Sequence, residues 1–286
     1  MISRAVVTVS YDSDGPLESF LASLSPAQHP DTAVYVADNL PDKGMAAAIA
    51  ASHGAQYLPM PGNLGYGGAI NRVFDTIPST VNWVLISNPD VVLEEDAIST
   101  LIRTAEQDDR IGSVGPMVKN PDGTVYPSAR RVPSIRTGIG HALFANVWQG
   151  NPWTAKYHND DGTDPALRRA GWLSGSCLLV RREAFDSIGG FDDDFFMYFE
   201  DVDLGYRLDK AGWKNIYQPA AKVVHAGAHS TAKSPSLMLQ AHHRSAERFI
   251  KKKYSHPLLW PIRLLATTGL RLRAALALRN SLRQDR

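Results

Sequence analysis

The sequence predicts an α/β domain built on a largely parallel central sheet. Over the first 87 residues, short apolar segments alternate with segments of helical character, and this alternation is typical of parallel strands joined by helices. Short polar stretches follow the predicted strands. Because ligands bind outside the carboxyl ends of the strands in such sheets, we expect a ligand site at that edge.

The elements follow one another in a regular order. The expected strands of the first part are 5–10, 33–37, 55–59 and 83–87, with helices over 17–24, 44–53 and 67–77 between them. Residues 120–169 are rich in Pro, Gly, Asn and Asp, which indicates loops that close over a substrate. A second compact stretch follows, with strands over 177–181, 213–217 and 223–225 and helices over 183–188 and 200–211.

Size and charge suggest how the chain is divided. It has 286 residues, 44% of them hydrophobic, which is enough for the core of one large domain with a small appendage. Residues 241–286 carry 11 Lys and Arg against 2 Asp and Glu, whereas the rest carries 19 against 27. We expect a main domain over 1–230, with halves that meet near residue 118, and a basic helical extension over 231–286.

Cysteine usage and apolar runs bear on the compartment. The single cysteine, Cys177, lies in an apolar run, so neither a disulfide framework nor a cysteine-ligated zinc site is expected. Residues 1–10 alternate like a strand and lack the pattern of a secretion signal, and no apolar run reaches the length of a bilayer span. We expect a cytoplasmic protein.

A glycine-rich turn over 63–71 leads into a predicted helix. It would present backbone N–H groups at a positive helix end, which suits an anion such as a diphosphate. The third glycine of a dinucleotide fingerprint is replaced by Ile70, and no GK[ST] follows. A tight strand-to-helix turn without a ligand is the alternative.

Two side chains are candidates for holding a metal. Asp90 follows the apolar strand 83–87, and His225 ends another predicted strand. Magnesium and manganese commonly take one or two protein carboxylates and complete their shell with substrate phosphates and water. The alternatives are that Asp90 caps a following helix over 93–104 and that His225 is structural.

A cluster of carboxylates, Glu200, Asp201 and Asp203, stands beside large apolar residues over 196–204. Apolar surroundings raise the pKa of a carboxyl group and suit it to accept a proton near neutral pH. Acids are also favoured at a helix N-terminus by the helix dipole, and that interpretation does not exclude catalysis.

Taken in order, these segments resemble glycosyltransferase family 2, whose members have the GT-A nucleotide-diphospho-sugar transferase fold. The resemblance covers about residues 6–230. It is carried by residues 7–11, 36–39, 63–67, 88–90, 175–176 before 182–185, 190–192 and 200–203.

The resemblance implies roles for individual residues. Asp201 would be the general base of an inverting sugar transfer, within a catalytic group that includes Glu200 and Asp203. A divalent metal, Mg²⁺ or Mn²⁺, would bind Asp90; the family commonly has two aspartates where this chain has Asn88 and Asp90, so His225 would assist. The donor half, 1–118, would bind the nucleotide sugar through Ser10, Tyr11, Asp12, Asp38, Asn39, Asn63, Gly65, Tyr66, Gly67, Asn71 and Asn88, and the acceptor half, 119–230, would use Trp172, Ser174, Gly175 and Ser176.

Within the family, the stretches over 88–90, 200–203 and 225–230 look most like rhamnosyltransferases that use dTDP-L-rhamnose. The resemblance is to enzymes that act on decaprenyl-diphosphate-linked N-acetylglucosamine, the linker between arabinogalactan and peptidoglycan. It implies a nucleotide sugar donor, a lipid-linked acceptor and a role in cell-wall synthesis. Another donor or acceptor within the family is the alternative.

The composition of the C-terminal tail indicates which partners the protein would contact. From His256 it carries many leucines together with Arg263, Arg271, Arg273, Arg279 and Arg283, which would suit peripheral association with the inner face of the plasma membrane. These arginines scatter around a helical wheel, so packing on the main domain or on a second subunit of a homo-oligomer is equally compatible. No nucleic-acid motif accompanies the basic residues, and we expect no nucleic-acid partner.

Two function classes outside the family compete with it. A sugar-phosphate nucleotidyltransferase would carry a glycine- and arginine-rich loop after the first strand, where this chain has residues 10–13, Ser-Tyr-Asp-Ser. A non-catalytic nucleotide-sugar or carbohydrate-binding protein would have no need of the carboxylates over 200–203.

Overall fold

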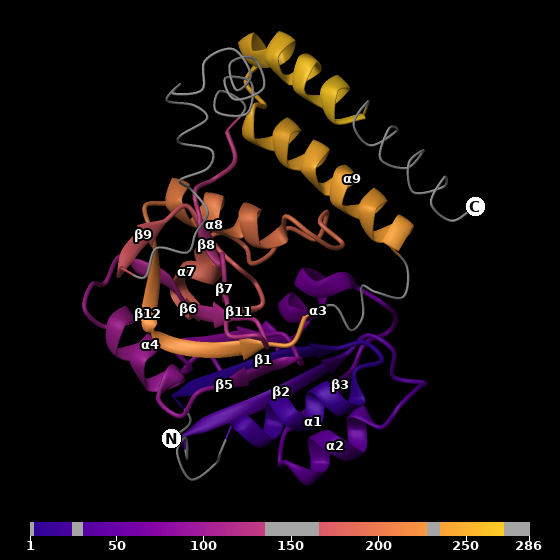
Figure 1. Cartoon of the computed structure of the whole chain (residues 1–286), viewed down its shortest axis with the longest axis vertical. Coiled ribbons are helices and arrows are strands. Elements are labelled where there is room, and N and C mark those ends of the chain that lie inside the picture. Colours follow the sequence, from indigo (N-terminus) through magenta and orange to yellow (C-terminus); the bar gives the residue numbers. More distant parts are fainter. Residues whose placement is uncertain (1–2, 25–30, 135–165, 228–234, 272–286) are drawn as a thin grey trace.

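The computed structural model describes residues 3–24, 31–134, 166–227 and 235–271 (Figure 1). Parts of the loops expected over 120–169 and of the basic tail, including Arg273, Arg279 and Arg283, lie outside the described residues. Within the described ranges, no helix combines the length and the apolar character that crossing a bilayer requires.

A mixed, mostly parallel sheet forms the centre, in the strand order β3-β2-β1-β4-β11-β6-β12-β5. The strands β3, β2, β1 and β4 are mutually parallel, as are β6 and β12, whereas β11 runs antiparallel to both β4 and β6. The predicted α/β fold with a largely parallel sheet is confirmed. The strands of this path are β1 (Arg4–Ser10), β2 (Thr32–Asp38), β3 (Gln56–Pro59), β4 (Trp83–Ser87), β5 (Val91–Leu93), β6 (Ile111–Lys119), β11 (Cys177–Arg181) and β12 (Lys214–His225).

Short strands complete the sheets near the site. β7 (Val125–Tyr126) pairs with β6, and β9 (Arg168–Ala170) pairs with β12. A separate ribbon joins β8 (Ala129–Arg130) to β10 (Trp172–Leu173) in antiparallel fashion. This ribbon leads directly into the turn before β11.

Helices cover both faces of the sheet, so its strands are buried on both sides. On β1, Val7 belongs to one hydrophobic cluster and Val6 to the other, as expected when successive side chains point to opposite faces. One cluster includes residues of α3 (Gly65–Phe74), α7 (Arg182–Ser187) and α8 (Glu200–Lys210). The other includes residues of α1 (Asp14–Ser23), α2 (Ala46–Ser52) and α4 (Ala97–Ala105).

Three strands on the main path of the sheet differ from the sequence expectation. β6 was not expected, because the run from Ile111 contains Gly and Pro, which weaken a strand pattern. β5 is a further short strand not foreseen, formed because it pairs with the end of β12. The two strands expected over 213–217 and 223–225 form one strand, β12, with a register shift between Gln218 and Lys222.

The C-terminal extension packs on the main domain through α9 (Pro235–Lys253). Phe249 is 1% exposed and its ring lies against the rings of Phe199 and Tyr206. A short 3₁₀ turn, Pro257–Leu259, follows, and residues 260–271 form a helix that runs back beside α9 (Figure 1). The Arg271 guanidinium and the Glu247 carboxylate join the two helices at 2.5 Å.

We expect Phe249→Ala to lower the free energy of unfolding by about 3 to 5 kcal/mol, because it leaves a cavity between α9 and α8. Urea unfolding followed by circular dichroism measures the change. Met45→Ala is the matched control, since Met45 is 62% exposed and surface truncations usually change stability by less than about 0.5 kcal/mol. Equal stability of the two variants would mean that α9 does not contribute to the core.

Candidate active site

The site lies at the carboxyl ends of the parallel strands. Register pairs Ser10 at the end of β1 with Asp38 at the end of β2, and β4 ends beside them at Ser87. The polar residues that follow these strands are thereby gathered at one edge of the sheet, as expected from sequence.

Asp90 and His225 meet through pairing of β5 with β12. Val91 is opposite His225 in that pair, and the backbone N–H of Ala226 donates to the carbonyl of Asp90 at 2.9 Å. The imidazole Nε2 of His225 lies 3.0 Å from Oδ1 of Asp90 and 3.3 Å from the amide of Asn88. Both proposed metal ligands therefore face the same point.

Glu200 and Asp201 begin α8. The residues before them, Tyr198 and Phe199, have φ of 65° and 67°, a left-handed conformation that is costly for residues with a side chain and that clusters at functional sites. Oδ2 of Asp201 accepts a hydrogen bond from the backbone N–H of Gly175 at 3.0 Å.

Burial raises the pKa values of both carboxyl groups, and the charge of Asp201 adds to the shift at Glu200. The pKa of Glu200 is raised to about 8, first by desolvation and then by the charge of Asp201. Desolvation also raises the pKa of Asp201, although hydrogen bonds from Gly175 and Val202 oppose that shift. The pair can therefore hold or accept a proton near neutral pH.

Tyr66 lies close to the turn that holds Asp201, and the charges of Glu200, Asp201 and Asp90 all act on it. Its hydroxyl donates to the carbonyl of Gly175 at 2.5 Å, and its pKa is raised well above the usual value by burial and by the charges of Glu200, Asp201 and Asp90, among others. The turn that Tyr66 contacts also bonds to Asp201 through Gly175 and to Asn88 through Ser176, so the carboxylate pair and the metal-side residues lie around that turn.

Asp203 lies in the first turn of α8 with Glu200 and Asp201, but its contacts are with other residues. It is fully buried, its Oδ2 accepts from Arg207 at 2.6 Å, and its Oδ1 lies 2.7 Å from the ammonium of Lys252 on α9. These contacts give Asp203 a structural place between α8 and α9. Its expected catalytic role finds no support in its contacts.

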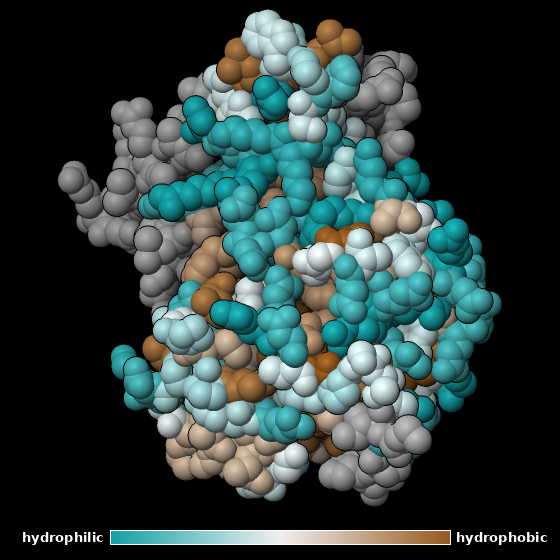
Figure 2. Space-filling model, turned by 180° about the vertical axis from the view of Figure 1, so that it is seen from behind, coloured by the Kyte–Doolittle hydropathy of each residue, from teal (hydrophilic) through white to brown (hydrophobic). Residues whose placement is uncertain are grey.

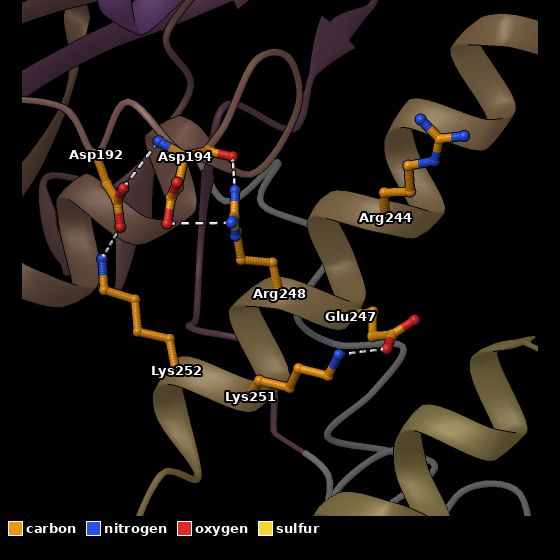
Figure 3. Close-up of a pocket in the computed structure, with 7 residues that line it drawn as sticks. All are labelled: Asp192, Asp194, Arg244, Glu247, Arg248, Lys251 and Lys252. Atoms are coloured by element: carbon orange, nitrogen blue, oxygen red, sulfur yellow. Dashed lines mark hydrogen bonds and ion pairs between the residues drawn. The ribbon is translucent and has the colours of Figure 1, made fainter.

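A groove of about 580 Å³ lies beside α9. Figure 3 shows Lys252 reaching Asp192 and Arg248 reaching Asp194 across it, whereas Lys251 pairs with Glu247 one turn away on α9 itself. Because most of its cations are already paired with acids, the groove attaches α9 to the 192–194 loop and offers little free positive charge to a ligand.

The residues expected to hold the nucleotide are divided between exposed and internally bonded side chains. Tyr11 and Asp12, which follow β1, are exposed, whereas Ser10 is buried. Asp38 is 2% exposed and accepts from the Tyr57 hydroxyl and the Leu40 N–H. The exposure of Tyr11 and Asp12 makes both side chains accessible to a base or ribose.

The glycine-rich turn is bonded within the protein. Asn63 accepts from the N–H of Gly65 at 3.0 Å, and Asn39 donates to the carbonyl of Gly65 at 2.9 Å. Gly65 has a φ of 74°, and a Cβ there would stand 2.2 Å from the carbonyl oxygen of Phe196, which itself accepts from the Tyr66 N–H. The contacts favour the alternative of a tight turn over that of a diphosphate cradle.

Gly67 and Asn71 face the neighbouring loop. A Cβ on Gly67 would meet the side chain of Phe191 at 2.8 Å. The Asn71 side chain donates to the Phe191 carbonyl and the Asp193 carboxylate and accepts from the Phe191 N–H, at 2.8 to 2.9 Å. Both residues thus join α3 to the segment before α8.

The expected acceptor residues form the turn between β10 and β11. Ser174 and Ser176 are buried and their hydroxyls are 3.0 Å apart, and the Ser176 carbonyl accepts from the Asn88 N–H at 2.9 Å. The indole of Trp172 donates to the Arg131 carbonyl at 3.1 Å. The turn contacts the metal side through Asn88 and the base side through Gly175.

Tyr126 and Arg130 were not identified from the sequence. Tyr126 is 38% exposed, and its pKa is raised by burial and by the charge of Asp201, against a lowering effect of Arg130. Arg130 also lowers the pKa of Asp201. They lie in the stretch interpreted as substrate loops, where no periodicity marks single residues.

Comparisons with known proteins identify the family. Residues 4–247 match the family model described as "Glycosyltransferase like family 2". The chain is 44% identical to N-acetylglucosaminyl-diphospho-decaprenol L-rhamnosyltransferase of Mycobacterium tuberculosis, over 98% of this chain and 94% of that protein. It is 28% identical to the rhamnosyltransferase WbbL of Escherichia coli K12, over 62% of this chain and 64% of that one.

Solved structures share the fold. The mannosyltransferase PcManGT of Pyrobaculum calidifontis, in complex with GDP-Man and Mn²⁺, aligns with a TM-score of 0.60 at 14% identity, over 97% of this chain and 72% of that one. GalNAc-T7 with UDP, GalNAc and Mn²⁺ aligns with a TM-score of 0.57 at 14% identity, over 79% of this chain and 44% of that one. The chain is a glycosyltransferase with the GT-A fold, and it belongs to the glycosyltransferase-like family 2.

Proposed function

We propose that this enzyme transfers L-rhamnose from dTDP-L-rhamnose to N-acetylglucosamine on a polyprenyl diphosphate, with inversion at the anomeric carbon. The observation that carries the proposal is the pair of carboxyl groups with raised pKa values, Glu200 and Asp201. Their charges and that of Asp90 all act on Tyr66. The name of the relative from Mycobacterium tuberculosis, matched over nearly the whole of both chains, supports the choice of sugar and acceptor.

Asp201 is the general base in this proposal. As the acceptor hydroxyl oxygen attacks the anomeric carbon, its proton passes to the Asp201 carboxylate, and the bond from that carbon to the donor diphosphate breaks on the opposite face. The Gly175 N–H holds one oxygen of Asp201, so the carboxylate has a fixed direction. Burial raises the pKa of Asp201, so its carboxylate takes up a proton more readily than an exposed carboxylate does.

Asp90 and His225 would hold a divalent metal. The fit rests on their 3.0 Å contact, which points a carboxylate oxygen and an imidazole nitrogen at one place, a donor set that substrate phosphates and water would complete. When bound, Mg²⁺ or Mn²⁺ would neutralise the departing diphosphate as a Lewis acid. The Asn88 amide lies 3.3 Å from the same nitrogen, Nε2 of His225, so Asn88 would stand beside the metal.

A lipid-linked acceptor would require the enzyme to work at a bilayer surface. We therefore propose that it acts in the cytoplasm at the inner face of the plasma membrane. The basic C-terminal extension, with 11 Lys and Arg in residues 241–286, supports that placement.

The test of the function is release of nucleotide diphosphate from a panel of sugar nucleotides, with and without Mg²⁺ or Mn²⁺, using a short polyprenyl-diphosphate N-acetylglucosamine as acceptor. We expect release only with dTDP-L-rhamnose, acceptor and metal together. Turnover of a different donor would refute the rhamnose assignment. No release from any donor would favour a non-catalytic binding protein.

Substitutions at the carboxylate pair separate the base from its neighbour. Asp201→Asn is expected to lower kcat by about 100- to 10,000-fold, the usual contribution of a general base, with donor affinity retained in calorimetry. Glu200→Gln, which preserves shape at the adjacent position, is the matched control and is expected to cost much less. If Glu200→Gln has the larger effect, the roles of the two residues are exchanged.

A further inference from the structure

The helix over residues 260–271 and the turn before it expose an unusual set of side chains. Of the eleven large hydrophobic side chains that are exposed among the described residues, five fall within residues 258–265. Figure 2 shows brown, hydrophobic atoms at the top of the molecule, where this helix begins in Figure 1. We call this set the outer face; it comprises Leu258 (81% exposed), Trp260 (58%), Ile262 (42%), Leu264 (57%) and Leu265 (64%).

The polarity of this helix is reversed relative to an ordinary surface helix, which turns its apolar side to the core. Thr267 is only 7% exposed, with its hydroxyl bonded to the Leu264 carbonyl at 3.1 Å, and Arg263 and Ala266 are half-buried. A helix that buries a threonine and exposes leucines gains no hydrophobic stabilisation in water. Contact with an apolar medium would therefore stabilise the outer face.

The orientation of the outer face is fixed by ion pairs. Two nitrogens of Arg271 lie 2.5 and 3.0 Å from the Glu247 carboxylate on α9, and Lys251 lies 2.7 Å from the same group. These cations lower the pKa of Glu247 to about 2. The helix is thus held against α9 with its leucines turned away.

The sequence on both sides of the outer face is rich in Lys and Arg. Residues 241–271 contain seven Lys and Arg and a single acid, Glu247. Four of these cations, Arg248, Lys251, Lys252 and Arg271, are paired with acids, and the others are Arg244, Lys253 and Arg263. Lys and Arg near an apolar helix face, with a Trp among the apolar residues, are the pattern of helices that lie in the headgroup region of an anionic bilayer.

A second copy of the chain fits the outer face less well. A standard protein interface uses roughly 20 to 30 residues on each side, whereas the outer face has five large apolar side chains along about 12 Å of helix. A narrow strip of this kind suits insertion between lipid headgroups.

We propose that the outer face docks the enzyme on an anionic lipid bilayer, with Leu258, Trp260, Ile262, Leu264 and Leu265 inserted at the headgroup level. The proposal deepens the proposed function, on which it rests for its purpose, because it names the surface that meets the membrane carrying the acceptor. α9 then links the membrane-bound helix to α8 through the contact of Lys252 with Asp203.

The test is flotation of the full chain with vesicles of phosphatidylglycerol and phosphatidylcholine in equal parts, without any substrate. The variant is the double substitution Leu264→Gln with Leu265→Gln. The control is Met45→Gln, which also replaces an exposed apolar residue (62%) but lies near α2, at the opposite end of the molecule (Figure 1). Both variants are expected to unfold at the wild-type temperature, because all three side chains are exposed.

We expect the double variant to bind vesicles about tenfold more weakly or worse, and Met45→Gln to bind like the wild type. We also expect binding to weaken on pure phosphatidylcholine and at high salt, since the cations act through screened charge. Equal flotation of the double variant and the wild type overturns the proposal, and so does a double variant that loses only an oligomer in gel filtration. Because no sugar is transferred in this assay, a failed donor panel with intact flotation would refute the function alone.

Discussion

The peptide backbone of Gly175 is hydrogen-bonded on both sides by side chains from distant parts of the chain. Its carbonyl accepts from Tyr66 on α3, and its N–H donates to Asp201 on α8. A Cβ at this position would lie 3.3 Å from the Tyr66 ring and 3.4 Å from the Cβ of Asp201, so a side chain here would require the Tyr66 ring to move by a few tenths of an ångström. The next carbonyl, that of Ser176, bonds to Asn88 beside Asp90. One short turn therefore fixes the distance between the metal side and the base side.

The C-terminal extension also contacts the residues that precede Glu200 and Asp201. The left-handed residues Tyr198 and Phe199 would be costly without neighbours, and α9 supplies them. His242 packs against both rings, Phe249 packs against Phe199, and Ser245 donates to the Met197 carbonyl at 2.8 Å. Through these contacts, a helix that lies outside the sheet helps to set where Glu200 and Asp201 stand. A membrane-docked extension would therefore hold the carboxylates in a defined place relative to the bilayer.

Much of this arrangement could be predicted from the sequence. The alternation of strands and helices identified the parallel sheet, and the polar residues after β1, β2 and β4 identified its ligand edge. The approach of His225 to Asp90 could only be expected from resemblance, because it depends on β5, a three-residue strand too short to show a pattern. The partners of Asp203 could not be foreseen at all. Its contact Lys252 is 49 residues away on α9, and first-turn acids look alike in sequence whether they face a substrate or a core.

The pH dependence of sugar transfer tests the central claim most directly, namely that Asp201 is a base whose pKa is raised by burial. A base must be deprotonated, so a raised pKa means that kcat/KM falls as the pH is lowered through a value above the ordinary carboxyl range, and the apparent values belong to the pair. In Asp201→Asn, the titrating base is gone, and this acidic limb should disappear from the residual activity. A limb that persists unchanged in Asp201→Asn, or a flat wild-type profile between about pH 5 and pH 9, would contradict the account.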